Sequence, residues 1–351
     1  MKPLLIRSIV LSIMTVVLYL VMWPTKVDPL AWEAPQNSGF TGSFAVNDKL
    51  KAIKKLPLGD GVGPEDVDVD AAGWVYGGLQ DGRIVRFKGG DMEVFADTKG
   101  RPLGLAFYGD DLLVADSFKG LLRINPKGEI ETLATEADGL AFGFTDDLDV
   151  TKDGVVFFTD ASHKFNQHQY QDDGLEHQPN GRFLSYDLKS GEVEVLVKDL
   201  YFPNGVSVSH DGAFVLVTET WNYRVLKFWI NGPKQGTWEP ILENLPGFPD
   251  GISRGQSGIF WLALAAPRDN LLDMLAPWPF IRKILARLPK SLKPDAVPYA
   301  CVLGIDAKGR VKYNLQDPNA SSFGTITSVE EKDGRLWLGS LKERAIGYYD
   351  L

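Results

Sequence analysis

The sequence predicts an all-β fold, a six-bladed β-propeller that carries an N-terminal transmembrane helix. Three observations support this prediction. Short β-type runs preceded by tight turns recur six times, the 36 Gly, 21 Pro and 11% aromatic residues favour turns and strands, and a long apolar run opens the chain. The length of 351 residues corresponds on average to about two domains, but barrel-like β folds use such a length as one.

Residues 1–25 are predicted to form an uncleaved membrane anchor. Residues 4–23 contain one charge, Arg7, and a helix of that length spans about 30 Å, the thickness of the bilayer hydrocarbon. The alternative, a cleaved signal peptide, requires small residues after the apolar run, and residues 21–26 do not supply them. The basic Lys2 and Arg7 before the run place the N-terminus in the cytoplasm and the propeller on the extracytoplasmic side, whether periplasmic, extracellular or lumenal.

Residues 26–39 are predicted to be a linker, and residues 40–351 to form the propeller. Each of six predicted hairpins has a turn followed by an apolar run, with another alternating run before the turn. The shorter repeat spacings, about 40 residues, fit one four-stranded blade. The apolar runs are residues 74–76, 112–114, 155–158, 214–217, 260–262 and 336–338.

One equivalent position in each blade is reached by counting back seven residues from its turn. This position should lie where the innermost strand begins, at one mouth of the central channel. Residues 40–57 are expected to supply the last strand of the sixth blade, because closure of the ring removes exposed strand edges. The six positions are Glu65, Leu103, Asp146, Asn204, Asp250 and Ile326.

Four of these positions carry oxygen donors, namely Glu65, Asp146, Asn204 and Asp250. Three carboxylates at one point must share a proton, shift their pKa values or bind a cation. Ca²⁺, which takes roughly six to eight oxygen ligands, fits this set better than Mg²⁺. The alternative is that Asp and Asn before strands are ordinary turn residues. Against it, Glu is a poor turn former and all four residues share one register.

The predicted rim loop at residues 160–181 is long enough to be a lid or a specificity element. His163 lies three residues beyond a predicted strand end, and it is a candidate proton carrier because its free pKa is near 6.5. The alternative is a solvated loop histidine. The acids at three strand ends, Asp116, Asp160 and Glu219, are predicted first of all to bond the backbones of neighbouring loops.

A second long rim loop is predicted at residues 266–298. Within it, residues 271–290 mix apolar residues with four basic residues at helical spacing, Arg282, Lys283, Arg287 and Lys290. One interpretation is a basic amphipathic helix on a membrane surface. The other is a helix that covers the pocket with its apolar face. The two are compatible, because the anchor keeps the chain at a bilayer.

Composition excludes several classes of function. The 37 Lys and Arg against 46 Asp and Glu give a net charge of −9, which argues against nucleic acid as a partner. A single Cys excludes an internal disulfide framework and a thiolate zinc site. The four His show no spacing typical of a pair of zinc ligands.

Motifs around the six positions resemble the strictosidine synthase-like and gluconolactonase/paraoxonase superfamily of six-bladed propellers. Within it, the chain is most similar to the branch of adipocyte plasma membrane-associated proteins and their bacterial relatives. The resemblance runs from about residue 61 to the C-terminus, and the motifs do not specify a substrate. They are Gly63-Pro64-Glu65-Asp66, Gly100-Arg101-Pro102-Leu103-Gly104, Phe144-Thr145-Asp146-Asp147-Leu148, Phe158-Thr159-Asp160-Ala161-Ser162, Phe202-Pro203-Asn204-Gly205-Val206 and Pro246-Gly247-Phe248-Pro249-Asp250.

The resemblance implies a Ca²⁺ at the channel mouth, with Glu65, Asp146, Asn204 and Asp250 at the positions of the family ligands. The family usually has Asn at the position of Asp146, and the added negative charge should tighten cation binding and weaken the Lewis acid. Members that hydrolyse esters and lactones use the metal to polarise a carbonyl. Asp250 would then act as base or nucleophile. We expect a membrane-anchored, Ca²⁺-dependent hydrolase of small-molecule lactones or aryl esters.

Two other functions remain open. One is the amine–aldehyde condensation of strictosidine synthase, a branch that relies on a Glu general base without a metal. Retention of four oxygen donors in one register argues against it. The other is a non-catalytic binding module, since propellers also present their rims to partners.

Overall fold

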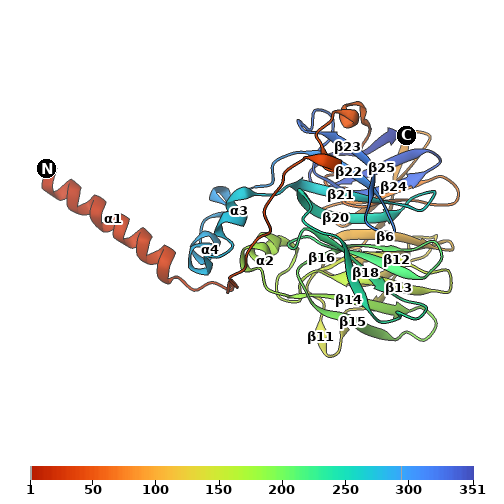
Figure 1. Ribbon diagram of the computed structural model, residues 1–351, viewed down its shortest axis with the longest axis horizontal. Helices are drawn as coiled ribbons and strands as arrows, with labels where there is room; N and C mark the ends of the chain where they lie inside the picture. Colours follow the sequence, from red (N-terminus) through yellow and green to blue (C-terminus); the bar gives the residue numbers. More distant parts are fainter. Residues whose placement is uncertain (1, 294) are drawn as a thin grey trace.

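The computed structural model describes residues 2–293 and 295–351 and confirms the six-bladed β-propeller (Figure 1). Met1 of the expected anchor and Pro294 of the second rim loop lie outside the described residues. Within the described part of the chain, six four-stranded antiparallel sheets form the blades. The first strands of neighbouring blades contact one another, so they surround the channel axis.

The blades follow one another along the chain, and each runs from the channel outward. Blade 1 contains β2 (Val67–Val69), β3 (Val75–Gly78), β4 (Arg83–Lys88) and β5 (Asp91–Asp97). Blade 2 contains β6 (Pro102–Tyr108), β7 (Asp111–Asp116), β8 (Gly120–Ile124) and β9 (Ile130–Ala134). Blade 3 contains β12 (Thr145–Val150), β13 (Val155–Asp160), β14 (Gly181–Asp187) and β15 (Val193–Leu200), and the small hairpin β10 (Glu136–Ala137) and β11 (Leu140–Ala141) precedes it.

The second half repeats the pattern. Blade 4 contains β16 (Pro203–Val208), β17 (Phe214–Glu219), β18 (Arg224–Trp229) and β19 (Trp238–Leu242). Blade 5 contains β20 (Gly247–Arg254), β21 (Ile259–Pro267), β22 (Ala300–Asp306) and β23 (Val311–Asp317). Blade 6 contains β24 (Ile326–Lys332), β25 (Arg335–Ser340), β26 (Ala345–Asp350) and β1 (Lys54–Pro57).

The strand β1 closes the ring, as the sequence predicts for residues 40–57. It pairs antiparallel with β26, so that Lys54 lies opposite Tyr348 and Pro57 opposite Ala345. The outermost strand of blade 6 therefore comes from the start of the propeller and its other three strands from the end. Short 3₁₀ turns at Gly42–Phe44 and Lys49–Ala52 lead into β1 and pack on β23.

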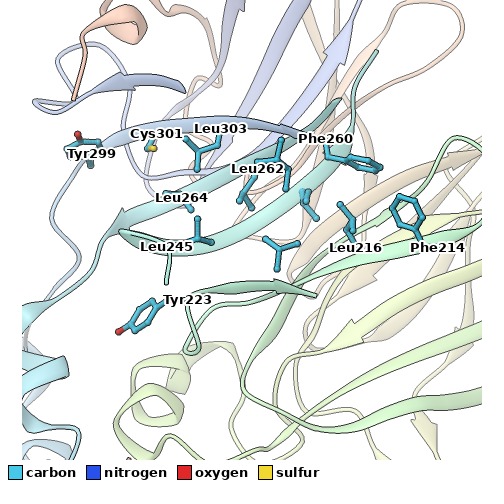
Figure 2. Packing of buried hydrophobic residues seen from close by; sticks show 13 residues of the cluster. Phe214, Leu216, Tyr223, Leu245, Phe260, Leu262, Leu264, Tyr299, Cys301 and Leu303 are labelled. Atoms are coloured by element: carbon cyan, nitrogen blue, oxygen red, sulfur yellow. The ribbon is translucent and has the colours of Figure 1, made fainter. Parts of the chain in front are cut away.

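Apolar side chains fill the spaces between blades. Figure 2 shows one such core between blades 4 and 5, to which β17 contributes Leu216 and β21 contributes Leu262 and Leu264. These residues come from the alternating runs of the sequence, and each is almost fully buried. The lone Cys301 lies in the same core, where burial raises the pKa of its thiol. Side chains that alternate along each strand thus join every blade to both neighbours.

The helix α1 (Lys2–Met22) projects from one rim of the propeller (Figure 1). Residues Pro3–Met22 have a mean hydropathy of 2.4 and their side chains are not buried in the protein, so this helix is a candidate transmembrane span. The same rim carries α2 (Tyr170–Glu176), α3 (Asn270–Leu275) and α4 (Pro279–Ala286). We call α2, α3 and α4 the cap.

The expectation of a single helix within residues 271–290 is wrong. Two short helices, α3 and α4, are separated at residues 276–278. Pro279 begins α4 as its first residue, a position where the missing N–H of proline is tolerated, whereas in a continuous helix it would break the hydrogen-bond ladder. A 3₁₀ turn at Lys290–Leu292 follows.

The segment after α1, residues 24–40, is a strap that is bonded to the cap rather than a free linker. Val27 is buried in one cluster with Leu175 of α2. Glu176 accepts hydrogen bonds through its carboxylate from Asp28 N (2.7 Å) and through its carbonyl from Leu30 N (3.0 Å). The residues predicted as a linker, 26–39, therefore couple the anchor to the rim loop at residues 160–181.

His177, at the end of α2, makes the strap sensitive to pH. Its ring stacks on Trp32 of the strap with centroids 3.8 Å apart, and burial, with a smaller contribution from the charge of Arg282, lowers its pKa to about 3. As the pH falls from 6.5 toward 3, the unfolded chain takes up a proton that folded His177 does not. The contribution of His177 to the free energy of unfolding therefore falls by several kcal/mol, at about 1.4 kcal/mol per pKa unit.

We expect His177→Asn to flatten this part of the pH profile, measured by thermal unfolding between pH 8 and pH 4. Asn tolerates the positive φ of 48° at this position. The exposed His168→Asn is the matched control and should keep the wild-type slope. Equal slopes in all three proteins would contradict the assignment.

Candidate functional site

The four oxygen donors predicted from the register lie around one space. Glu65, Asp146, Asn204 and Asp250 line two adjoining cavities at the cap end of the channel. One cavity, of about 250 Å³, continues down the channel between the innermost strands, and we call it the channel cavity. The other, of about 460 Å³, opens beneath the cap, and we call it the cap pocket. The donors thus form the floor of a pocket and the top of a channel.

The innermost strands are irregular at the donor positions. Glu65 lies two residues before the start of its strand, β2. The other three donors lie inside β-bulges at the start of their strands. A bulge adds one residue and turns its side chain away from the regular alternation, as is typical beside active sites. The register shifts fall between Thr145 and Leu148, between Pro203 and Val206, and between Pro249 and Ile252.

A glycine follows Asn204 because the next blade leaves no room for a side chain. A Cβ on Gly205 would lie 2.5 Å from Asp250 O and 2.5 Å from Ile252 N. Both are backbone atoms, so the neighbouring strand would have to move. The glycine therefore sets the distance between the strands that carry Asn204 and Asp250.

We expect Gly205→Ala to destabilise the protein by about 1–3 kcal/mol, the usual range for overpacking, and to weaken cation binding. Thermal unfolding with and without Ca²⁺ measures both effects. A variant with the melting temperature and Ca²⁺ response of the wild type would show that this close approach does not position the donors.

The three strand-end acids have the structural role predicted for them. Each accepts a hydrogen bond from a backbone N–H two or three residues before a channel-mouth position. They therefore hold the chain that enters the innermost strand, and they place the donors indirectly. The pairs are Asp116 Oδ1 with Arg101 N (2.9 Å), Asp160 Oδ1 with Phe144 N (2.9 Å) and Glu219 Oε1 with Tyr201 N (2.8 Å).

A second group of acids lines the channel cavity and joins the blades. Each uses one carboxylate oxygen for the next N–H of its own strand and the other for an N–H of the adjacent innermost strand. The alternating acids at residues 66–69 and 147–150 are the sequence signal for this pairing, and sequence reasoning missed it. The contacts between blades are Asp66 Oδ2 with Leu105 N (2.8 Å), Asp68 Oδ2 with Phe107 N (3.1 Å), Asp147 Oδ2 with Val206 N (2.8 Å) and Asp149 Oδ2 with Val208 N (2.7 Å).

Burial makes ionisation of the donors unfavourable. It raises the pKa of Glu65 to about 7, although the positive charge of Arg101 acts in the opposite direction. Burial, followed by the charges of Glu65 and Asp250, raises the pKa of Asp146 well above its ordinary value. The pKa of Asp250 is raised by burial and by Glu65, and a hydrogen bond from Asn204 partly offsets this. Three carboxylates therefore lie close enough to repel one another.

Nearby cationic side chains do not neutralise these carboxylates directly. Arg101 is almost fully buried, and its Nη1 donates to Gly63 O (2.8 Å) rather than to a carboxylate. Among the described residues, Asp146 Oδ2 and Asp250 Oδ1 are buried without a hydrogen-bond partner. Unpaired buried carboxylate oxygens are costly unless a cation or water meets them. The donor set of three carboxylates and one amide oxygen fits a hard cation such as Ca²⁺.

The donor side chains lie farther apart than ligands that are bound to one ion. Within residues 2–293 and 295–351, no three His, Cys, Asp or Glu side chains have the spacing of a closed metal site. Glu65, Asp146, Asn204 and Asp250 are therefore residues that could hold a cation once they approach it.

The cap pocket above the donors has an aromatic wall. Phe144, Phe202, Trp221 and Phe248 form a continuous series, with successive ring centroids 5.2, 5.2 and 5.6 Å apart. Trp221 is fixed to α2 because its Nε1 donates to Asp173 Oδ1 (2.9 Å). An apolar cavity of this size with polar groups at one end is typical of a site for a small organic molecule.

Two predicted positions differ from the structure. Ile326, reached by counting, is fully buried in an apolar core, and the residue of blade 6 that lines both cavities is Thr327. Blade 6 has the same bulge as blades 3 to 5, but its hairpin is tighter: Lys332 pairs with Arg335, whereas in blade 3 Val150 pairs with Val156, and a fixed count from the turn therefore falls one residue early. His163 is exposed, its Nδ1 lies 2.6 Å from Asn180 O, and it lines neither cavity, so the structure does not bring it to the donors.

Comparison with known proteins agrees with this architecture. The family model described as strictosidine synthase matches residues 146–233, and the one described as strictosidine synthase-like, N-terminal, matches residues 42–87. Protein Strictosidine synthase-like 10 of Arabidopsis thaliana is 34% identical, over 99% of this chain and 99% of its own. Adipocyte plasma membrane-associated protein of Bos taurus is also 34% identical, over 91% of this chain and 83% of its own.

Solved structures support the fold. A gluconolactonase from Xanthomonas campestris has a TM-score of 0.60 at 15% identity, covering 84% of this chain and 88% of its own. Regucalcin from Agrobacterium tumefaciens, described as a calcium-binding protein, has a TM-score of 0.58 at 15% identity, covering 83% and 93%. Because the family models match within the propeller and relatives of 34% identity extend over nearly the whole chain, the chain belongs to the strictosidine synthase-like family.

Proposed function

We propose that this chain is a membrane-anchored, Ca²⁺-dependent hydrolase of esters or lactones, with its propeller on the extracytoplasmic side. The observation that carries the proposal is the junction of the two cavities. An aromatic pocket for an organic molecule ends on four oxygen donors, and Asp146 Oδ2 and Asp250 Oδ1 are unpaired there. The gluconolactonase and the calcium-binding regucalcin of the same fold support the assignment by analogy.

In the proposed reaction, water adds to the substrate carbonyl carbon, and the bond from that carbon to the alkoxy oxygen breaks. A bound Ca²⁺ would supply polarisation of the carbonyl and stabilisation of the oxyanion. Asp250 Oδ1 takes the proton from the attacking water and then gives it to the leaving alkoxide. Asn204 lies beside Asp250 on both cavities, and its amide favours the ionised form of this carboxylate, which lowers the pKa of Asp250 against the effect of burial. The aromatic wall excludes water from the rest of the substrate.

The direct test uses the purified full-length chain with phenyl acetate, longer aryl esters and a set of lactones. We expect turnover in Ca²⁺, loss of turnover with a chelator, and recovery when Ca²⁺ is restored. Cation binding is measured separately by isothermal titration. Cation binding without turnover of any ester or lactone would reject the hydrolase and favour a structural metal in a binding module.

The family match favours a second candidate, the amine–aldehyde condensation. That reaction needs a Glu general base, and Glu65 is the one Glu that lines the cap pocket within the described residues. Condensation of an aryl-ethylamine with an aldehyde that persists in chelator and disappears in Glu65→Gln would support this candidate. Under the hydrolase proposal the chelator removes all activity.

A further inference from the structure

The outer face of the cap carries large apolar side chains that the protein does not cover. Met274, Trp278 and Phe280 are 63%, 60% and 59% exposed, respectively. Singly exposed apolar residues are ordinary, but a contiguous group of them on one side of a protein marks a contact surface. We call this group the cap surface, and its members are Leu271, Met274, Trp278, Phe280, Ile281 and Leu292.

The helix α4 buries a charged side chain and exposes two large apolar ones. Its buried residue is Arg282, which is 2% exposed, whereas Phe280 and Ile281 face outward. Both terminal nitrogens of Arg282 donate inside the protein, to the carbonyls of Leu175 (3.1 Å), Ala276 (3.0 Å) and Leu30, whereas its Nε has no partner among the described residues. Leu285 and Ala286 pack on the buried cluster around Leu175, so Phe280 and Ile281 are the apolar residues of α4 that remain for a partner that is not water.

The end of α1 fixes where this surface lies. Arg287, which follows α4, donates through Nη1 to Leu20 O (3.0 Å) and through Nε to Trp23 O (2.5 Å), and Tyr19 Oη donates to Arg287 O (3.1 Å). A helix of this length spans the hydrocarbon core of a bilayer, so Tyr19 and Trp23 lie at its boundary. Figure 1 shows α3 and α4 between α1 and the blades. The hydrogen bonds therefore hold α4 at the depth of the lipid headgroups.

We propose that the cap surface docks into the bilayer beside α1 as a second, interfacial membrane contact. The occupant is the lipid itself, because Arg287 ties the end of α4 to the spanning helix and the exposed apolar side chains of the cap surface lie in the same rim loop. Interfacial segments of this kind place aromatic and aliphatic side chains into the headgroup boundary. Lys290, two residues before Leu292, is exposed and suits the polar side of such a contact, whereas Lys283 pairs with Asp28 of the strap (3.1 Å).

The docking also determines where the cap pocket opens. Leu272 of α3 and Val297 line the pocket, and they belong to the same rim loop as the cap surface. Val297 is itself exposed. A molecule that enters between them passes the membrane boundary, so the substrates are amphiphilic esters or lactones dissolved in the bilayer. This substrate class rests on the proposed hydrolase, whereas the docking does not.

The docking is tested on the full chain reconstituted in phosphatidylcholine vesicles, with single cysteines introduced at Phe280 and Met274 and labelled with bimane. Cys301 is 1% exposed and does not compete for the label. The matched control is Trp238→Cys, an exposed aromatic at the start of β19, whose partner Phe228 lies at the end of β18 away from the cap. We expect lipids with brominated chains to quench labels 280 and 274 several-fold more than label 238. Quenching of label 280 by aqueous iodide as strong as that of label 238 would overturn the docking.

The substrate class has its own readout. Phe280 and Trp278 line neither cavity. The variants Phe280→Ser and Trp278→Ser should therefore leave kcat and KM for a water-soluble ester unchanged. They should raise the apparent KM several-fold for a long-chain ester presented in vesicles. Equal KM values for the vesicle substrate would reject delivery from the bilayer. If no ester is turned over in either form, the hydrolase fails while the bimane labels still decide the docking.

Discussion

Asp250→Asn is expected to lower kcat for aryl esters and lactones by about 10²–10⁴-fold, the usual contribution of a positioned proton acceptor. Asn keeps the shape of Asp but cannot take a proton from water. The proton acceptor in the proposed reaction is Asp250 Oδ1, an atom with no hydrogen-bond partner among the described residues. The substitution therefore removes the acceptor without breaking a hydrogen bond of that oxygen.

The same variant should fold, and without a cation it should be at least as stable as the wild type. Burial and the charge of Glu65 raise the pKa of Asp250, which means that the folded protein disfavours its ionised form. An uncharged Asn at this position relieves that penalty. Lower activity together with unchanged or higher stability is typical of a functional residue and not of a structural one.

Asp68→Asn is the matched control for loss of a buried acid in the same channel. Asp68 lines the channel cavity but not the cap pocket, and its oxygens accept from Val69 N and Phe107 N. We expect this variant to lose stability and to keep most of its activity. Activity is measured as kcat and stability as the melting temperature. Near-native kcat in Asp250→Asn, or equal losses in both variants, would remove Asp250 from the mechanism.

The sequence is sufficient to predict the ring of six blades and the four oxygen donors at the floor of the cap pocket. Hairpins depend on local turn and strand patterns, so their repetition revealed the six blades, and a common count from each turn brought Glu65, Asp146, Asn204 and Asp250 together. Closure by residues 40–57 followed from the need to cover strand edges, and β1 confirms it. These features depend on local sequence patterns or on the repetition of one blade around the ring.

What the sequence did not reveal depends on contacts between distant segments. The tighter hairpin of blade 6 moves the channel position from Ile326 to Thr327, and a fixed count from the turn does not register the length of the hairpin. The prediction of a linker at residues 26–39 misses the contacts of this segment with Glu176 and His177. These contacts join residues about 150 positions apart, which a local sequence pattern does not reveal. The inward direction of Arg282 reverses the usual rule for charged residues, and only its three carbonyl partners explain it.

Saturating Ca²⁺ is expected to raise the melting temperature by about 5 °C or more at pH 8 and by much less at pH 5. A ligand at roughly one hundred times its Kd stabilises the folded state by about 2.7 kcal/mol, and each kcal/mol shifts Tm by roughly 2–4 °C in a mid-sized protein. The gain depends on pH because cation binding requires ionised carboxylates, with which protons compete.

The direction follows from the pKa of Glu65, which is about 7 in the folded chain against an ordinary value of 4.5. Between these values the folded protein binds more protons than the unfolded chain does. The contribution of Glu65 to the stability of the cation-free protein therefore falls as the pH rises from 4.5, and this loss is complete above 7. Ca²⁺ offsets this loss by pairing with the ionised donors. The difference between Ca²⁺ and chelator should thus be small near pH 4.5 and largest above pH 7.

Glu65→Gln separates this site from general binding of Ca²⁺ to an acidic protein. It removes one ligand charge, so most of the thermal gain at pH 8 should disappear, and the stability of the cation-free protein should vary less between pH 4.5 and 7. Glu243→Gln, at an exposed surface position, is the matched control and should retain the wild-type gain. A Ca²⁺ gain that is equal in both variants, or that grows as the pH falls, would place the cation elsewhere and leave the four donors as a purely structural ring.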